Sequence, residues 1–235
     1  MSLGPAAGFV AVGHRGAAGH EPENTLRSIR RALELGAAGI EVDVQFVDGE
    51  LIVFHDKRLE RTTNGRGPLA RQTFAQIRQL DAGSGERIPT LREVLETVNQ
   101  RAFVNIELKG PRTAAPVSTL IAEFICHHGW KAEHFLVSSF QRRELRAIID
   151  PAIRIGLLLT RPSRLYHISA RHVRAWSVHP AVRYTTRKFV EDAHRRGWKV
   201  FPYTANTPTQ IAHIKATGAD GVFTDYPERV AQSGG

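Results

Sequence analysis

Cysteine is almost absent from this chain of 235 residues, in which Cys126 stands alone. A single cysteine cannot form an internal disulfide, and it has no second thiolate with which to build a cysteine-based metal site. This composition fits a reducing compartment, so we expect a cytoplasmic protein.

Long apolar runs are also missing. No stretch approaches the roughly 20 apolar residues that a membrane-spanning helix needs, and the first residues lack the basic start and apolar core of a secretory signal. We therefore expect no stable association with a membrane. Residues 1–7 are interpreted as a disordered leader or a cloning remnant, and one domain is expected to span residues 8–231.

Aromatic residues make up only 8% of the chain, whereas the net charge at neutral pH is +9. A basic chain can serve a polyanion, a membrane surface or an anionic small substrate. The arginines are scattered, mostly in predicted helices, without the aromatic interleaving or the motifs of a nucleic-acid binder. We therefore expect a solvated basic surface and no nucleic-acid partner.

Short β-rich runs alternate with longer amphipathic runs along the chain. Eight parallel strands are predicted, at residues 9–13, 39–44, 102–108, 135–138, 153–159, 173–178, 199–203 and 221–223. Helical stretches lie between most of them; one is closed by Gly36, and another opens with Thr90 and Glu93 in the spacing of a capping box. Repeated strand–helix units in a chain of this length predict an α/β fold, a closed (β/α)₈ TIM barrel.

The stretch EVDVQFVDGELIVFHD, residues 41–56, breaks the alternation because it holds two strands and no helix. We expect an antiparallel hairpin that rises from the barrel mouth. A two-residue turn would pair His55 with Val42, whereas a three-residue loop ending at Gly49 would pair His55 with Glu41. The second register places His55 on the same face as the acidic residues of the first strand, and we favour it.

Residues 56–101 separate this hairpin from the next predicted barrel strand. The segment starts with the turn-rich RTTNGRGP, ends with the capped helix, and is too short for a separate domain. We expect a small insertion that lies over the C-terminal mouth of the barrel.

Polar residues occur where barrel strands are expected to end. Catalytic groups of such barrels come from the C-terminal ends of the strands and from the loops that follow. The residues at these positions are His14, Arg15, Glu41, Asp43, His55, Glu107, Lys109, Ser138 and Ser139. Charged groups at positions where a core strand should be apolar indicate an active site. No G-x-S-x-G sequence surrounds the two serines, so a serine nucleophile is not expected.

Three of these residues are carboxylates. Glu41 and Asp43 are two positions apart on a strand, so their side chains share a face. With Glu107 from a neighbouring strand they form an all-oxygen set, which suits a hard divalent ion such as Mg²⁺ or Ca²⁺ better than zinc. Solvent-facing carboxylates are the alternative, but the apolar residues that flank Glu41 and Asp43 favour a central strand.

Two cations and two histidines complete the set. Arg15 and Lys109 could hold a phosphate against the metal. His14 and His55 ordinarily titrate near neutrality, so they could exchange protons as general base and general acid. Structural histidines are the alternative, and their partners at strand ends argue against it.

Eight short motifs resemble the glycerophosphodiester phosphodiesterase family. They are HRG (14–16), PENT (22–25), EVDV (41–44), FHD (54–56), RTTNGRG (61–67), ELK (107–109), SSF (138–140) and TDYP (224–227). Any one of them is a weak signal. Eight of them in family order, from His14 to Pro227, make a strong one.

The resemblance implies a barrel enzyme that uses a divalent metal to hydrolyse glycerophosphodiesters to sn-glycerol 3-phosphate and an alcohol. It implies that His14 is the base and His55 the acid. The metal ligands would be Glu41, Asp43 and Glu107, and the phosphate-binding residues would be Arg15 and Lys109. The implied reaction begins with attack of the substrate's own glycerol 2-hydroxyl on phosphorus, and water then opens the cyclic phosphate.

Three further residues belong to the expected site. Phe140 and Tyr203 are interpreted as substrate-contacting walls of the mouth; the family often has tryptophan at the position of Tyr203. Glu23 lies at the turn into the first helix, where a purely structural role would suffice. Equally, Glu23 could bond Arg15 or a metal ligand from behind the site.

Two alternatives stay open. A lysophospholipase D or a phospholipase would act on a longer lipid by the same chemistry, but the polar insertion offers no apolar surface beside the mouth. A catalytically silent phosphate-binding protein would not need a pair of histidines. We expect a small-molecule glycerophosphodiester as the binding partner, and a monomer or a homodimer.

Overall fold

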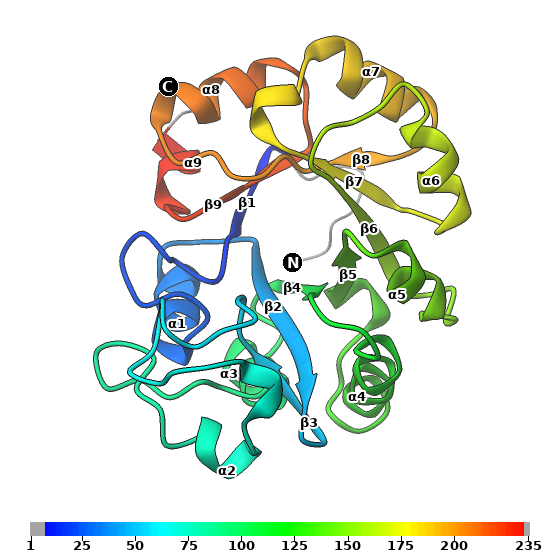
Figure 1. The fold of residues 1–235 in the computed structure, drawn as a ribbon. Coiled ribbons are helices and arrows are strands. Elements are labelled where there is room, and N and C mark those ends of the chain that lie inside the picture. Colours follow the sequence, from blue (N-terminus) through cyan, green and yellow to red (C-terminus); the bar gives the residue numbers. More distant parts are fainter. Residues whose placement is uncertain (1–7, 233–235) are drawn as a thin grey trace.

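Parallel strands form a nearly closed barrel in the computed structural model, which describes residues 8–232 (Figure 1). The eight parallel strands of this part of the chain are β1 (Val10–Gly13), β2 (Gly39–Val47), β4 (Phe103–Leu108), β5 (Phe135–Ser139), β6 (Arg154–Leu159), β7 (Ser177–Pro180), β8 (Lys199–Val200) and β9 (Gly221–Thr224). Their order is β8-β7-β6-β5-β4-β2-β1-β9. The predicted (β/α)₈ barrel is confirmed, and the expected leader of residues 1–7 lies outside the described residues.

Backbone hydrogen bonds close the barrel between β9 and the segment that follows β8. Phe223 N donates to Pro202 O (2.9 Å), and Ala205 N donates to Phe223 O (3.0 Å). Pro202 therefore turns its backbone edge toward β9, where its missing N–H leaves the ladder incomplete. This explains why β8 ends at Val200, short of the predicted residues 199–203.

Helices cover the outside of the barrel (Figure 1). They are α1 (Leu26–Glu34), α3 (Leu91–Val98), α4 (Ala114–His127), α5 (Arg142–Ala147), α6 (Tyr166–His172), α7 (Arg187–Arg195), α8 (Pro208–Ala216) and α9 (Glu228–Gln232), with short 3₁₀ turns η2 (Ala132–His134) and η3 (Val182–Tyr184). The predicted capping box is present at the start of α3, where Thr90 and Glu93 bond each other's backbone N–H. Among residues 8–232, no helix is long and apolar enough to span a membrane.

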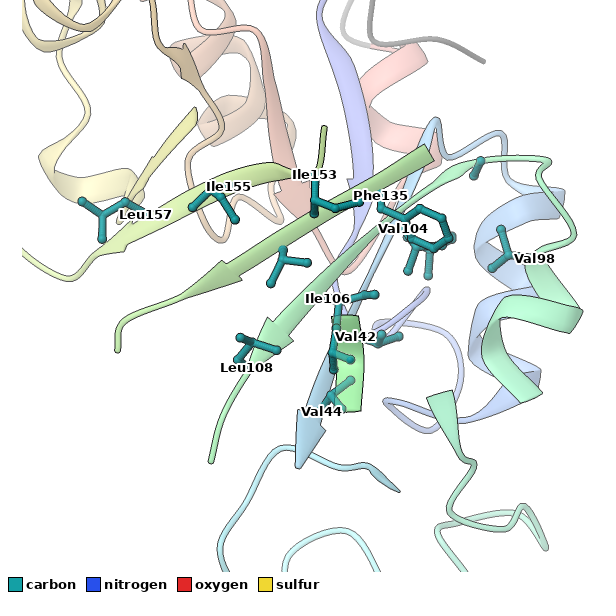
Figure 2. Packing of buried hydrophobic residues seen from close by; sticks show 14 of the residues in the cluster. Val42, Val44, Val98, Val104, Ile106, Leu108, Phe135, Ile153, Ile155 and Leu157 are labelled. Carbon is teal, nitrogen blue, oxygen red and sulfur yellow. The ribbon is translucent and has the colours of Figure 1, made fainter. Parts of the chain in front are cut away.

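Side chains alternate between the two faces of the strands, and this alternation positions the site. The register pairs Val42 with Ile106 and Val44 with Leu108, and these side chains belong to the main apolar core. Figure 2 shows this core around β2 and β4, with Val98 on the neighbouring helix α3. Because successive residues point to opposite faces, the polar residues between these apolar ones point into the barrel.

The strand β7 is displaced from the predicted residues 173–178. Val173 ends helix α6, and Arg174 takes a left-handed backbone conformation with φ of 55°. The strand therefore begins at Ser177 and continues to Pro180, which brings His179 into the barrel.

The expected three-residue hairpin loop is wrong. Strand β3 (Glu50–Val53) pairs with β2 so that Val47 lies opposite Glu50, which leaves a two-residue turn. Asp48 and Gly49 both have positive φ, 49° and 82°, as a type I′ turn requires. Pairing with β2 stops soon after Val53, so the alternation that the prediction relied on no longer governs His55.

Between β3 and α3 the chain builds a small core of its own, with the short helices η1 (Leu69–Arg71) and α2 (Phe74–Ile77). The buried apolar residues of this core are Val47, Ile52, Phe54, Leu59, Leu69, Ile77, Ala82 and Ile88. The backbone N–H of Phe74 donates to Asp48 Oδ2 (2.7 Å), which ties α2 to the hairpin turn. The insertion is thus packed on the hairpin and held in place.

Candidate active site

A cavity of about 200 Å³ lies among the C-terminal ends of the barrel strands. Its lining residues are His14, Arg15, Glu41, His55, Asn105, Glu107, Lys109, Phe140, Leu158, Tyr203 and Phe223. Two of the predicted site residues, Asp43 and Glu23, are not in this lining, but both form ion pairs with Arg15, which is part of it. The structure thus gathers the predicted residues at one place, while their roles stay predictions.

Three carboxylates from two neighbouring strands meet at this cavity. The register places Asp43 opposite Glu107, and Glu41, Asp43 and Glu107 each offer an oxygen atom within 4.8 Å of the others. Glu41 is 2% exposed and Asp43 is 1% exposed. Buried carboxylates this close repel one another unless positive charge lies between them.

The electrostatics of this cluster fit a divalent cation. Burial raises the pKa of Glu41, and the charge of Asp43 raises it further. The same two causes, in the same order, raise the pKa of Glu107. Glu41 Oε1 is buried without a hydrogen-bond partner among residues 8–232. An oxygen-rich cluster with one unsatisfied buried oxygen is compatible with a hard divalent metal ion.

Two side-chain cations face the carboxylates. The Lys109 ammonium donates to Glu107 Oε1 (2.8 Å) and lies 3.5 Å from Asp43 Oδ1. Arg15 Nε lies 3.1 Å from Asp43 Oδ2, and the backbone N–H of Arg15 donates to Glu41 Oε2 (2.8 Å). Both cations therefore lie beside the acidic cluster, where they can also face a phosphate.

The glycine of the HRG motif allows a close approach to helix α1. Gly16 has φ of 84°, and a Cβ atom there would lie 2.6 Å from the carbonyl carbon of Ser28. The Ser28 hydroxyl donates to Arg15 O (2.8 Å). Helix α1 thus packs directly on the loop and fixes the backbone of Arg15.

His14 has a carboxylate partner that the sequence interpretation missed. His14 Nδ1 donates to Asp225 Oδ1 (2.7 Å), and the amide of Asn206 donates to Asp225 Oδ2 (2.5 Å). Burial alone would lower the pKa of His14, but the hydrogen bond to Asp225 and the charge of Glu41 outweigh it and raise the pKa. With Nδ1 engaged, the Nε2 atom of His14 is left for a substrate.

His55 has a similar partner in the next residue. His55 Nδ1 donates to Asp56 Oδ1 (2.5 Å). Burial lowers the pKa of His55, and the charge of Asp43 and the bond to Asp56 only partly oppose this. The hairpin therefore brings His55 to the cavity although its register is not the predicted one.

Asn24 is a further buried residue that the sequence interpretation left out. Its backbone is left-handed, with φ of 59°, and its side-chain amide donates to Asp43 Oδ2 (2.9 Å). The backbone N–H of Asp43 donates back to Asn24 Oδ1 (3.3 Å). Asn24 thus holds Asp43 through two hydrogen bonds, and Thr25 caps helix α1.

Glu23 contacts two cations and is outside the lining of the cavity. Its Oε1 atom accepts from Arg15 (2.7 Å) and from Arg61 (2.7 Å). Burial would raise the pKa of Glu23, but hydrogen bonds from Arg61 and the charge of Arg15 lower it to about 2. The side chain therefore stays ionised and fixes Arg15.

Phe140 and Tyr203 form one wall of the cavity. Their rings meet edge to face with centroids 5.9 Å apart, and the Lys109 ammonium lies 6.0 Å from the centre of the Phe140 ring. Phe140 remains 43% exposed, so part of this apolar wall faces solvent. A substrate at the carboxylates would meet these rings on one side.

Three residues that the sequence interpretation missed lie within the motifs that it used. Asp56, Asp225 and Asn24 stand within FHD, TDYP and PENT, but nothing in their spacing links them to a particular histidine or carboxylate. The fold supplies that link, because His14 and Asp225 are brought together by the pairing of β1 with β9.

A (β/α)₈ barrel that carries three carboxylates, two cations and two carboxylate-bound histidines at its mouth defines a hydrolase-type site for an anionic substrate. Residues 14–229 match the model of the Glycerophosphoryl diester phosphodiesterase family, and the chain belongs to this family. The resemblance seen in the motifs is confirmed, and the chain is a phosphoric diester hydrolase that acts on glycerophosphodiesters.

Several relatives match along nearly their whole length. A glycerophosphodiester phosphodiesterase from Caldanaerobacter subterraneus subsp. tengcongensis is 37% identical over 93% of this chain and 95% of the relative. One from Bacillus altitudinis is 34% identical and covers 93% and 95% of the two chains. A phosphodiesterase from Oleispira antarctica, solved with its product sn-glycerol-3-phosphate, has a TM-score of 0.88 at 30% identity and covers 95% and 96%.

Proposed function

We propose that residues 8–231 form one catalytic domain that releases sn-glycerol 3-phosphate and an alcohol from glycerophosphodiesters, with a divalent metal and two histidines. The observation that carries this proposal is the cavity of about 200 Å³ in which His14 and His55 face the carboxylates and the two cations. The product bound to the Oleispira antarctica relative supports the glycerol phosphate half of the substrate.

Glu41, Asp43 and Glu107 would hold the metal, and Mg²⁺ and Ca²⁺ are the ions that suit three carboxylates. When bound, the ion would offset the negative charge of the phosphodiester and the further negative charge that develops on its oxygens during the reaction. Arg15 and Lys109 would bind phosphate oxygens beside it, because both lie at the edge of the same cluster.

His14 and His55 would move the protons. In the first step the glycerol 2-hydroxyl passes its proton to His14 Nε2 and forms the bond to phosphorus. The bond between phosphorus and the alcohol oxygen breaks, and His55 Nε2 gives its proton to that oxygen. Both Nδ1 atoms are held by carboxylates, Asp225 and Asp56, so each histidine has only Nε2 to offer.

In the second step water opens the cyclic phosphate with the roles exchanged. His55 takes a proton from the water as the water oxygen bonds to phosphorus, and His14 returns its proton to the glycerol oxygen. In the protein without substrate the pKa of His14 is raised and the pKa of His55 is lowered. These shifts favour the second step, in which His14 gives a proton and His55 takes one. Binding of the phosphodiester anion next to His55 would favour its protonated form for the first step.

The polar surroundings of the mouth favour a small headgroup over a long acyl chain. Beside the cavity lies a second hollow of about 490 Å³, whose only apolar side chains are the small ones of Ala18, Pro22 and Ala82, while its charged side chains are those of Glu21, Glu23, Arg61 and Asp81. A lysophospholipase D would need apolar side chains there to hold its lipid. The proposed substrate is therefore a water-soluble glycerophosphodiester.

Product analysis separates this function from its rivals. We expect sn-glycerol 3-phosphate from glycerophosphocholine, glycerophosphoethanolamine or glycerophosphoglycerol, at rates well above those for lysophosphatidylcholine. The reverse preference would indicate the lipid enzyme. His14→Ala should abolish turnover while a phosphodiester still binds in calorimetry, whereas a wild-type protein that binds but never releases product would be a silent binding protein.

A further inference from the structure

Arg61 of the insertion connects the two sides of the site through two carboxylates. Its Nε donates to Asp56 Oδ2 (2.5 Å), and its two terminal nitrogens donate to the two oxygens of Glu23 (2.7 Å each). Asp56 accepts from His55 with its other oxygen, and Glu23 accepts from Arg15. An unbroken row of charge-assisted bonds thus runs from His55 to Arg15.

All three nitrogens of the Arg61 guanidinium donate a hydrogen bond, and the bidentate contact with Glu23 fixes the plane of the group. Hydrogen bonds from Arg61, above all other causes, lower the pKa of Asp56 to about 2. Both acceptors therefore remain ionised at neutral pH, and three charge-assisted hydrogen bonds hold the 48% exposed Arg61 side chain between them.

The insertion holds the loop that presents Arg61. Leu59 is 1% exposed in the insertion core, and Thr63 N–H and Thr63 Oγ1 both donate to Leu59 O (3.2 and 2.8 Å). Asn64 and Asp81 join this loop to the far end of the insertion through Asn64 N to Asp81 O (3.1 Å). The arginine therefore sits on a fixed turn rather than on a free loop.

We propose that Arg61 is a positioning residue for the cleavage reaction: through Asp56 it sets the orientation of His55 for proton transfer to the departing alcohol, and through Glu23 it sets Arg15 for the phosphate. This inference rests on the proposed function. It assigns the insertion a part in the chemistry, beyond covering the mouth.

A comparison of two leaving groups tests the proposal. Glycerophosphoethanolamine releases an alcohol that must be protonated, whereas the p-nitrophenyl ester of glycerol 3-phosphate releases a stable anion that needs no proton. With the enzyme in excess, Arg61→Met should slow the first-turnover release of ethanolamine by roughly 10- to 100-fold. Release of p-nitrophenol should fall far less, because its rate does not depend on an acid.

Three further variants and one control variant show where the effect of Arg61 arises. Asp56→Asn should show the same dependence on the leaving group, and the Asp56→Asn/Arg61→Met double variant should be no slower than the slower single variant. Glu23→Gln weakens the contact that holds Arg15, so it should raise KM for both substrates by the same factor. Arg58→Met is the matched control, since Arg58 lies in the same loop, is 63% exposed and pairs only with Glu60 in the described structure.

The outcomes are distinguishable. An equal fall of the first-turnover rate at saturating substrate for both substrates in Arg61→Met, or additive falls of that rate in the double variant, would overturn the positioning role while leaving the proposed function intact. Failure of the wild-type enzyme to cleave either substrate would instead overturn the proposed function. Thermal unfolding checks that each variant is folded, and Arg61→Gln replaces Arg61→Met if the latter is not.

Discussion

At the scale of single residues, Asp225 decides which nitrogen of His14 can reach a substrate. The carboxylate only accepts, so it keeps the proton on Nδ1, and it is itself held by Asn206 through two hydrogen bonds. The proposed base therefore depends on a residue 211 positions away in the sequence.

Asp225→Asn should lower kcat for glycerophosphodiester cleavage on the order of 100-fold, because the amide nitrogen can donate to Nδ1 and leave the proton on Nε2. The variant also removes the hydrogen bond that raises the pKa of His14. Protonation of His14 at low pH removes the base and produces the acid limb of the kcat/KM profile. This limb should therefore move to lower pH.

Steady-state kinetics between pH 5 and pH 9 provide this comparison. Asp192→Asn is a suitable control, since Asp192 lies on helix α7 outside the barrel and pairs with Arg195 and Arg196 at the end of that helix. A wild-type rate in Asp225→Asn would show that His14 needs no orienting carboxylate.

At the scale of elements, the hairpin β2–β3 shows how a short turn controls the placement of both His55 and the insertion. Gly49 has φ of 82°, and a Cβ atom there would meet nothing within 4 Å. Any cost of a side chain at this position therefore comes from the backbone conformation alone.

Gly49→Ala should destabilise the protein by about 1–2 kcal/mol, because an L-residue is disfavoured in the left-handed region. The midpoint of unfolding in urea measures this change. Gly8→Ala is the control, since Gly8 does not have positive φ and also has open space around it. Equal midpoints for Gly49→Ala and the wild type would contradict the type I′ turn.

The strands and helices were largely predictable because apolar periodicity and capping residues act locally. Six of the eight predicted strands overlap the observed ones closely, and β8 is shorter than predicted. Strand β7 shifts because Arg174 reverses the backbone in a way that its residue type does not signal. The hairpin register was predicted wrongly because strand alternation was extended to His55, beyond the last paired residues.

At the scale of the whole molecule, the candidate site collects side chains from strand ends and loops that are far apart in the sequence. Strand–helix alternation predicted the fold, and polar residues at the expected strand ends predicted the carboxylates, both cations and both histidines as one set. The partners Asp225, Asn206 and Arg61 were not predicted, because their contacts exist only once the barrel closes and the insertion packs on the hairpin.

The arrangement also explains why the basic chain carries a compact acidic centre. Glu41 and Asp43 are buried and Glu107 is partly buried, the pKa values of Glu41 and Glu107 are raised, and Arg15 and Lys109 offset only part of the charge of the three carboxylates. A divalent cation would complete the balance, and the central proposal is therefore a metal-dependent phosphodiesterase.

The most direct measurement of that claim is the release of sn-glycerol 3-phosphate from glycerophosphoethanolamine by protein treated with a chelator and then supplied with Mg²⁺ or Ca²⁺. We expect chelation to abolish release, one of the two ions to restore it, and Glu107→Gln to weaken the restoration. Full activity after chelation would contradict the metal requirement, and no release under either ion would contradict the proposed function.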